Sequence, residues 1–163
     1  MAENLIIRKV KKEDNILLAK MIRKVFDEHN APQSGTVYTD PTTDNLYNLF
    51  QTPKSVLWVA EIDKQPMGCC GVYPTPGLNS DCAELVKFYL SNEIRGKGIG
   101  KQLMEQCINS AREMGFKYLY IESMPEFAKA VSIYKKQGFK TLDAPLGNSG
   151  HSGCDIWMIK ELE

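Results

Sequence analysis

The sequence predicts a single α+β domain over residues 1–163, with about seven strands in a mixed sheet and about four helices. Short apolar runs alternate with amphipathic stretches of helical period, in the order β, α, α, β, β, β, α, β, α, β, β. Turn residues separate these elements, and no linker, internal repeat or low-complexity tract divides the chain. A chain of 163 residues has the usual length of one domain, so one compact unit is expected.

Strands are expected where a short apolar run lies between turn signals. These runs are residues 5–10, 55–62, 67–73, 82–90, 117–122, 139–142 and 154–159. The polar turn at 63–66 is short enough to join its two neighbouring strands directly, which predicts an antiparallel hairpin.

Helices are expected where apolar residues recur every three or four positions. These stretches are residues 17–26, 46–50, 103–114 and 128–134. Asp14 is expected to cap the first helix, and Gly115 to end the third. Residues 30–44 are rich in Pro, Gly, Thr and Asp and therefore predict a loop. A loop of this length in a compact domain usually has a function.

Composition and charge argue against several classes of protein. Apolar residues make up 43% of the chain, and 20 basic side chains balance 20 acidic ones. Because a general nucleic-acid binder needs a basic excess or a basic stripe, no nucleic-acid partner is expected. Apolar runs are far shorter than a membrane span, and the N-terminal residues are too polar for a secretory signal. We therefore expect a cytoplasmic protein without a membrane partner.

The five cysteines predict neither a disulfide framework nor a metal site. Their number is odd, Cys69 and Cys70 are adjacent, and no pair has the spacing Cys-x-x-Cys. Three of them, Cys69, Cys82 and Cys107, lie in apolar patterns, where a thiol behaves as a small hydrophobic group.

A glycine turn, Arg95-Gly96-Lys97-Gly98-Ile99-Gly100, lies between a strand and a helix, where backbone N–H groups are suited to a phosphate. A phosphate-binding loop of the Walker type is excluded because Arg95 and Gln102 stand where Gly and Ser or Thr are required. The dinucleotide pattern GxGxxG fails because its last glycine falls on Lys101 or Leu103. A plain tight turn without a ligand remains the alternative.

The turn does fit the pattern Arg-x-x-Gly-x-Gly, at Arg95, Gly98 and Gly100. This pattern resembles the signature of the GCN5-related N-acetyltransferase (GNAT) superfamily. Residues 83–90 are similar to the strand that precedes the signature in that family, and residues 132–139 resemble its Tyr-x-x-x-Gly-Phe segment. The resemblance covers roughly the second half of the chain. It implies a mostly antiparallel sheet that splays between the signature strand and the next, with helices on both faces.

The resemblance implies that acetyl-CoA is the cosubstrate and that no metal takes part. Backbone N–H groups of the turn would hold the pyrophosphate, and the free edge of the signature strand would pair with pantetheine. The thioester carbonyl would lie near the Leu90 N–H, a donor for oxyanion charge. The residues expected to bind the cofactor are Phe88, Leu90, Arg95, Gly96, Lys97, Gly98, Ile99, Gly100 and Lys101.

Two residues are implied as catalytic. Glu84 matches the glutamate with which some members deprotonate the amine, and its apolar neighbours Leu85 and Val86 would raise its pKa. The alternative is a solvent-facing or substrate-binding carboxylate. Tyr134 matches the tyrosine that protonates the CoA thiolate in many members, and an ordinary core aromatic is its alternative. Where many members have an Asn that bonds the cofactor, this chain has Phe127.

The expected reaction is acetyl transfer to a primary amine, of a small molecule, within a ternary complex. A protein N-terminus as acceptor and a non-catalytic acetyl-CoA-binding module are the alternatives. Residues 31–40 and 146–153 are loops expected to set acceptor specificity. His151 lies in the second loop, and a lone loop histidine is usually polar surface. A homodimer is left open.

Overall fold

The computed structural model describes residues 4–162, so the ends of the expected domain, 1–3 and 163, lie outside the described residues. Seven strands form one sheet in the order β1-β2-β3-β4-β5-β7-β6. The strands are β1 (Leu5–Lys9), β2 (Val56–Ile62), β3 (Gln65–Tyr73), β4 (Cys82–Leu90), β5 (Tyr118–Ser123), β6 (Lys140–Leu142) and β7 (Ile156–Glu161). The helices are α1 (Asn15–Glu28), α2 (Leu46–Leu49), α3 (Ile99–Glu113) and α4 (Ala128–Lys136), with single 3₁₀ turns between elements.

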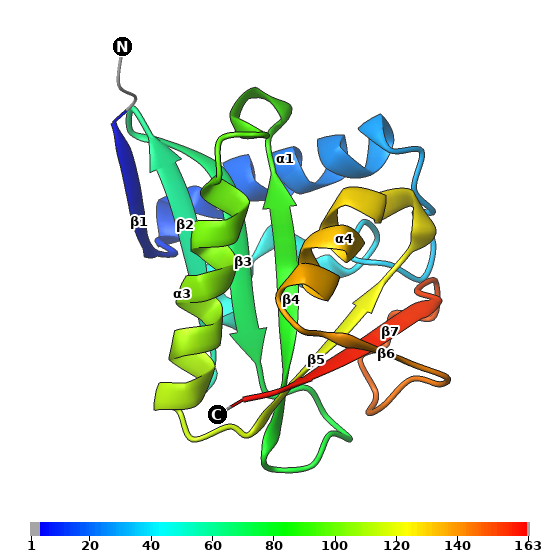
Figure 1. Cartoon of the computed structure of the whole chain (residues 1–163). Helices are drawn as coiled ribbons and strands as arrows, with labels where there is room; N and C mark the ends of the chain where they lie inside the picture. The colour runs from blue at the N-terminus through cyan, green and yellow to red at the C-terminus, as the bar shows by residue number, and fades with distance from the viewer. Residues whose placement is uncertain (1–3, 163) are drawn as a thin grey trace.

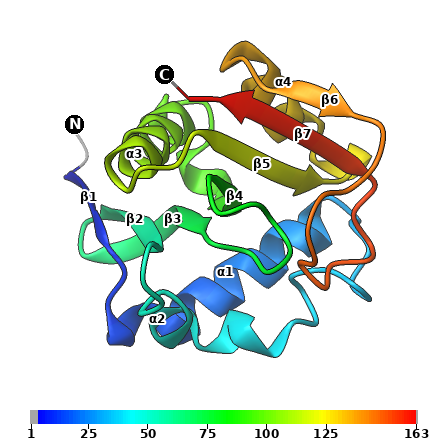
Figure 2. The same ribbon diagram turned by 90° about the horizontal axis from the view of Figure 1, so that it is seen from below.

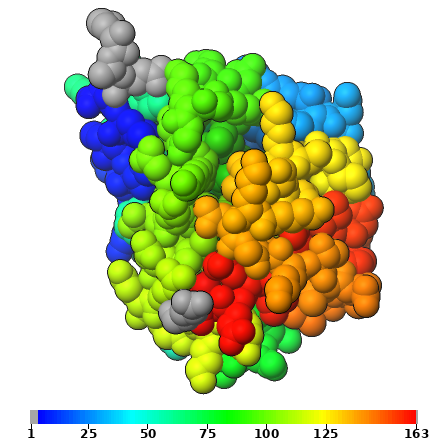
Figure 3. Space-filling model, viewed as in Figure 1, coloured from blue at the N-terminus to red at the C-terminus, as the bar shows by residue number. Residues whose placement is uncertain are grey.

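Helices cover both faces of the sheet. Helices α1 and α2 pack on one face, whereas α3 and α4 pack on the other (Figures 1 and 2). Two apolar clusters follow this division: one joins the strands to α3 and α4, and the other joins them to α1, α2 and the loop after α1. Figure 3 shows α3 and α4 side by side on the surface of their face. The mixed, two-faced α+β architecture expected from the sequence is confirmed.

The sheet divides between β4 and β5. Neighbouring strands run antiparallel along the described sheet except β4 and β5, which are parallel. These two strands pair at three positions only, Cys82–Tyr118, Ala83–Leu119 and Glu84–Tyr120. Beyond Glu84 no register partner on β5 faces the rest of β4 within the described chain. The splay implied by the resemblance is therefore present, and it leaves a free backbone edge on β4.

The β2–β3 hairpin is tighter than the sequence predicts. Strand β3 already begins at Gln65, so the turn consists of Asp63 and Lys64 rather than residues 63–66. Both turn residues have positive φ, 49° and 68°. Two such residues give the backbone twist that matches a right-handed hairpin, which explains why two residues suffice.

Asp14 is the N-cap residue of α1, as expected, but its side chain accepts no capping hydrogen bond from the helix. Its carboxylate instead accepts the Lys11 N–H at 2.7 Å and both terminal nitrogens of Arg8, at 2.8 and 3.0 Å. Arg8 also donates to Glu61 at 2.8 Å. Because the bidentate bonds to the guanidinium join two charged groups, the carboxylate turns towards β1.

The last strand also begins later than expected. Strand β7 starts at Ile156, and Cys154 lies before it, in a turn where its N–H donates to His151 O at 3.2 Å. All five cysteines are free thiols. Among residues 4–162, no helix is long and apolar enough to span a bilayer.

Candidate active site

A cleft of about 420 Å³ opens where β4 and β5 separate. It runs from the glycine turn, along the free edge of β4, to the ends of α1 and α4 and the loop before β7. Six of the residues predicted from the sequence line it: Glu84, Phe88, Leu90, Arg95, Gly96 and Tyr134. No group of three His, Cys, Asp or Glu residues is arranged to hold a metal ion in the described part of the chain.

The glycine turn brings backbone close to the mouth of this cleft. Gly96 and Gly98 have left-handed backbone, with φ of 77° and 78°, and a Cβ on either would meet no atom within 4 Å. Gly98 is the N-cap residue of α3. Gly100 differs, because a Cβ there would lie 3.1 Å from Leu90 Cδ1 and 3.2 Å from Phe88 Cζ. Gly96 and Gly98 therefore permit the left-handed turn, and Gly100 allows the start of α3 to pack closely against β4.

The other predicted turn residues do not line the cleft. The Ile99 side chain is buried in the core, whereas Lys97, Gly98 and Lys101 are exposed. Lys101 lies 3.9 Å from Glu105. The N–H groups in the first turn of α3 nevertheless lack partners within the helix, as at every helix start. Any contribution of Ile99 to ligand binding would therefore come from its backbone.

Arg95 has a structural contact that the signature alone does not indicate. Its guanidinium donates to Leu90 O from Nε at 3.1 Å and from Nη2 at 2.9 Å. It also forms an ion pair with Glu28 at 2.9 Å. The side chain therefore ties the end of β4 to the end of α1 and holds the turn between them.

The backbone N–H and C=O of Leu90 point to the gap between β4 and β5. Ser91 N–H donates to Met67 O at 2.8 Å, at the end of the β3–β4 ladder. Because bonded and non-bonded pairs alternate along an antiparallel ladder, the backbone groups of the next pair, Leu90 and Gly68, point away from each other. The bonds from Arg95 to Leu90 O agree with this orientation. The Leu90 N–H therefore points to the free edge.

Glu84 is 3% exposed and lies at the last paired position before β5 diverges. Ala83 and Leu85 belong to the cluster under α3, so alternation along the strand turns Glu84 to the α1 face. Burial, with a smaller contribution from the charge of Glu122, raises the pKa of Glu84 to about 7. A hydrogen bond of 2.7 Å from Thr75 and the charge of Lys87 oppose the rise.

Tyr134 lies on the opposite face of β4 from Glu84. It belongs to the cluster under α3 and α4, where its ring centroid lies 5.9 Å from those of Phe88 and Phe139. Burial raises the pKa of Tyr134 well above its usual value, so the phenol stays protonated at neutral pH. No fully buried side-chain oxygen lacks a hydrogen-bond partner among the described residues, so the unpaired hydroxyl has access to the cleft that it lines.

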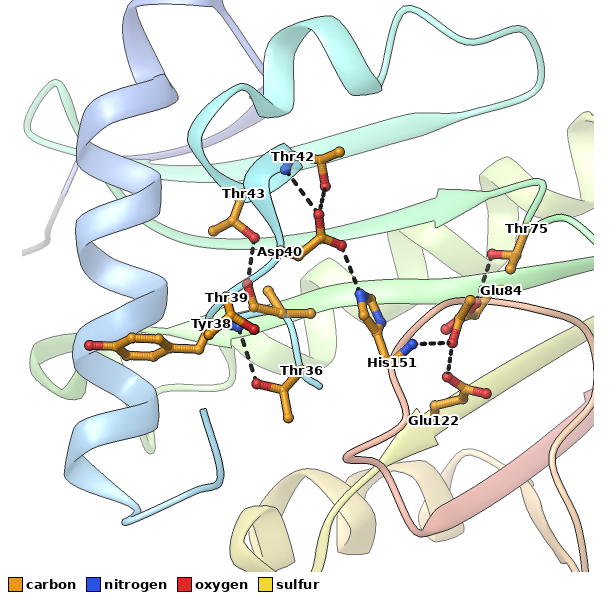
Figure 4. Close-up of polar contacts among 12 residues, drawn as sticks. Thr36, Tyr38, Thr39, Asp40, Thr42, Thr43, Thr75, Glu84, Glu122 and His151 are labelled. Carbon is orange, nitrogen blue, oxygen red and sulfur yellow. Dashed lines mark hydrogen bonds and ion pairs between the residues drawn. The ribbon is translucent and has the colours of Figure 1, made fainter. Parts of the chain in front are cut away.

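Loops far apart in the sequence close the α1 side of the cleft (Figure 4). His151 Nε2 lies 2.9 Å from Asp40 Oδ2, and Thr42 holds the other Asp40 oxygen through its N–H and hydroxyl. These bonds outweigh the effect of burial and lower the pKa of Asp40 to about 2. Ser149 donates to Glu122 on β5. The expectation that His151 is polar surface is therefore wrong, because its side chain is largely buried in this pair.

Sequence reasoning missed two other parts of the cleft. Lys87 lines it with only 6% exposure, although it lies within an apolar strand. Phe127 stands where the family often has an Asn, and it packs on Phe26 with ring centroids 5.1 Å apart. A lysine inside an apolar strand was the available signal for the first. Nothing in the local sequence indicated the second contact.

Comparison with known proteins identifies the family. The family model described as "Acetyltransferase (GNAT) family" matches residues 22–139. The chain belongs to the acetyltransferase (GNAT) family. Its sequence is 36% identical over 158 residues to the Escherichia coli protein named uncharacterized N-acetyltransferase YjgM, covering 96% of this chain and 95% of that protein. Membership makes it an acyl-CoA-dependent N-acyltransferase, as the resemblance implied.

Solved GNAT structures share the whole fold. An acetyltransferase of the family from Staphylococcus aureus superposes with a TM-score of 0.85 at 18% identity, covering 98% of this chain and 99% of that one. The PaiA N-acetyltransferase from Thermoplasma acidophilum, solved in complex with coenzyme A, gives 0.77 at 20% identity, with 99% of each chain covered. These likenesses establish the fold, and the acceptor of this chain is a separate question.

Proposed function

We propose that this protein transfers the acetyl group of acetyl-CoA directly to the primary amine of a small molecule, within a ternary complex. One observation carries the proposal: Glu84 and Tyr134 line the same cleft from opposite faces of β4, where the strand loses its partner. An acid and a base on the two sides of one free strand edge suit a reaction that takes a proton from one substrate and gives one to the other.

The donor side fits acetyl-CoA. The free edge of β4 offers unpaired backbone groups to an amide-bearing chain such as pantetheine. The start of α3, with the open space at Gly96 and Gly98, suits a pyrophosphate, because helix N-termini favour anions. In this arrangement, Phe88, Leu90 and the stretch from Arg95 to Lys101 bind the donor.

Side chains of the protein accept and supply the protons that the reaction transfers. Glu84, as the carboxylate, accepts a proton from the acceptor ammonium, and the free amine attacks the thioester carbonyl. The Leu90 N–H donates to the oxygen that gains charge as the C–N bond forms. The C–S bond then breaks as Tyr134 gives its proton to the departing thiolate, and the proton that the attacking nitrogen loses as the amide forms returns through water to the phenolate. Because the pKa of Glu84 is about 7, the carboxylate is available at neutral pH and is basic enough to hold the proton.

The closed acceptor side favours a small molecule over a protein chain. Gly153 N–H donates to Gly35 O at 2.7 Å, and Asn148 N–H donates to Pro76 O at 2.7 Å. The loop before β7 is thus tied to both neighbouring loops and covers the α1 side of the cleft. The five free thiols suit a reducing compartment, and we place the reaction in the cytoplasm.

The test measures donor binding and turnover separately. Acetyl-CoA is expected to raise the melting temperature of the purified chain, and small primary amines are expected to release CoA in its presence. A panel of amino acids, polyamines and N-terminal peptides identifies the acceptor class. If acetyl-CoA leaves the melting temperature unchanged, the proposal is wrong. Binding without turnover of any amine or peptide would favour an acetyl-CoA-binding module.

A further inference from the structure

Lys87 is a buried basic residue that the proposed chemistry does not use. It is 6% exposed and lines the cleft together with Glu84. Burial lowers the pKa of Lys87, and the negative charges of Asp40 and Glu84, on the α1 side, oppose this shift. Burying a lysine without a close partner is costly, because the ammonium loses its hydration.

An irregularity in β4 directs Lys87 to that side. In a regular strand, Lys87 would share the α3 face with Ala83 and Leu85. The β3–β4 register shifts between Cys69 and Gly71, and Lys87 has a left-handed φ of 57°. Beyond the shift, Phe88 and Leu90 take the α3 face instead. A non-glycine residue with such backbone is strained, and bulges beside active sites often re-aim a side chain.

The Lys87 ammonium has no close partner within the protein. Among residues 4–162, no hydrogen bond joins Lys87 Nζ to another group, and no carboxylate lies within the 4.0 Å of an ion pair. The described chain also holds no fully buried side-chain nitrogen without a hydrogen-bond partner. The Lys87 nitrogen therefore has access to the cleft, where an incoming anion is able to reach it.

The neighbouring carboxylates leave this position open to an anion. Both oxygens of Asp40 are engaged, by His151 and Thr42. The oxygens of Glu122 are likewise engaged, by Ser149 and Tyr120. Glu84 is the remaining carboxylate in the lining, and its proposed partner is the acceptor's ammonium. Lys87 and Glu84, one basic and one acidic, are therefore suited to a molecule that carries both a carboxylate and an ammonium group.

We propose that the acceptor is a free amino acid with an apolar side chain, whose carboxylate binds Lys87 while its amine faces Glu84. The inference rests on the proposed function and names its substrate class. An aromatic wall supplies the apolar part: Phe26, Tyr89 and Phe127 line the cleft, with ring centroids 5.1 to 6.2 Å apart. Such a wall holds an apolar side chain without a hydrogen-bonding requirement.

The experiment compares substrates that differ only in the carboxylate. CoA release is measured with L-phenylalanine, L-methionine and L-leucine, with their amides, and with the corresponding decarboxylated amines. Wild type is expected to favour each acid over its amide by roughly 10- to 100-fold in kcat/KM, the usual scale for a charged hydrogen bond. A ratio near one, or a preference for peptides, would overturn the inference.

Variants assign this preference to Lys87. Lys87→Met keeps the length of the side chain and removes the charge, so KM for the acids should rise until the acid-to-amide ratio approaches one. Lys87→Arg should retain part of the ratio. Lys24→Met, an exposed site on α1, is the matched control and should leave the ratio unchanged. The acetyl-CoA melting shift of each variant verifies folding and donor binding.

The outcomes separate the two proposals. If Lys87→Met binds acetyl-CoA and retains the full acid preference, carboxylate recognition by Lys87 is wrong while the acetyltransferase function stands. If wild type turns over amines without regard to the carboxylate, the amino-acid inference fails in the same way. If wild type acetylates no amine or peptide at all, the proposed function fails, and the inference fails with it.

Discussion

The donor side and the acceptor side of the cleft are built in different ways. On the donor side, one continuous stretch from β4 through the glycine turn to α3 supplies the free edge, the turn and the helix start. On the acceptor side, three segments distant in the sequence meet, and contacts such as His151–Asp40, 111 positions apart, join them. Local backbone geometry therefore determines the proposed donor site, whereas long-range packing determines the proposed acceptor site.

This difference explains how one fold serves many acceptors. In the proposed donor site the turn and the strand edge would bind through backbone groups, so side chains around them would be free to vary as long as the glycines remain. The acceptor side depends on side chains from loops, whose sequences tolerate change. Mutations on the two sides should consequently separate donor binding from acceptor turnover.

The largest effect should come from Glu84→Gln, which keeps the size of the side chain and the bond from Thr75 but removes the base. We expect kcat to fall by roughly 10² to 10⁴, the range for a general base. Acetyl-CoA affinity should stay unchanged, because Glu84 faces the acceptor side. Steady-state CoA release and a titration with acetyl-CoA measure the two quantities. Loss of donor affinity together with turnover would break the division between the two sides.

Gly98→Trp tests the donor side, where the expected loss is in acetyl-CoA binding rather than in turnover. An indole at the N-cap of α3 should cover the N–H groups there and weaken acetyl-CoA binding by roughly 10- to 100-fold, because helix-start anion sites need close backbone approach. Gly115→Trp is the matched control: it has the same left-handed backbone, no neighbour around its Cβ position, and lies at the far end of α3. Equal affinities in the two variants, by calorimetric titration, would refute the pyrophosphate position.

The sequence sufficed for most of the fold and indicated the residues of the proposed donor side, for a physical reason. Helical period, strand runs and the glycine turn are local patterns, and they predicted the helices, the strands and the residues beside the β4 edge. The errors arise where a contact with another element outweighs a local preference. Asp14 has the right type for a cap, but its long-range pairing with Arg8 on β1 outweighs that preference.

The residues of the acceptor side could not be predicted from the sequence in the same way. His151 and Asp40 look like ordinary loop residues until folding brings them within 2.9 Å. The lysine within an apolar strand was a signal for Lys87, but the shift in the β3–β4 register that directs it to the cleft is not predicted by any pattern within β4. Sequence spacing carries no information on such contacts, because they arise from tertiary structure alone.

The pH dependence offers a finer test of the acceptor side. If Glu84 is the base, kcat/KM should rise with pH through an apparent pKa of about 7 and then level off, since only the ionised form accepts a proton. Thr75→Val removes a hydrogen bond that lowers the pKa of Glu84. The midpoint should then move upward by about half to one unit, while the plateau at high pH is retained. A downward shift, or a profile without this midpoint, would exclude Glu84 as the group that titrates.

The smallest effect concerns the contact that closes the acceptor side. His151→Ala removes the pair with Asp40 and one attachment of the loop before β7, while the bonds from Ser149 to Glu122 and from Gly153 to Gly35 remain. Because the other bonds keep the loop in place and a single hydrogen bond contributes little, KM for the acceptor should rise only about two- to tenfold, with acetyl-CoA affinity unchanged. Ser152→Ala, an exposed site in the same loop, is the control for a general change in loop structure. A change in donor affinity of the same size would mean that the loop acts on the whole cleft, and that the two sides are not independent.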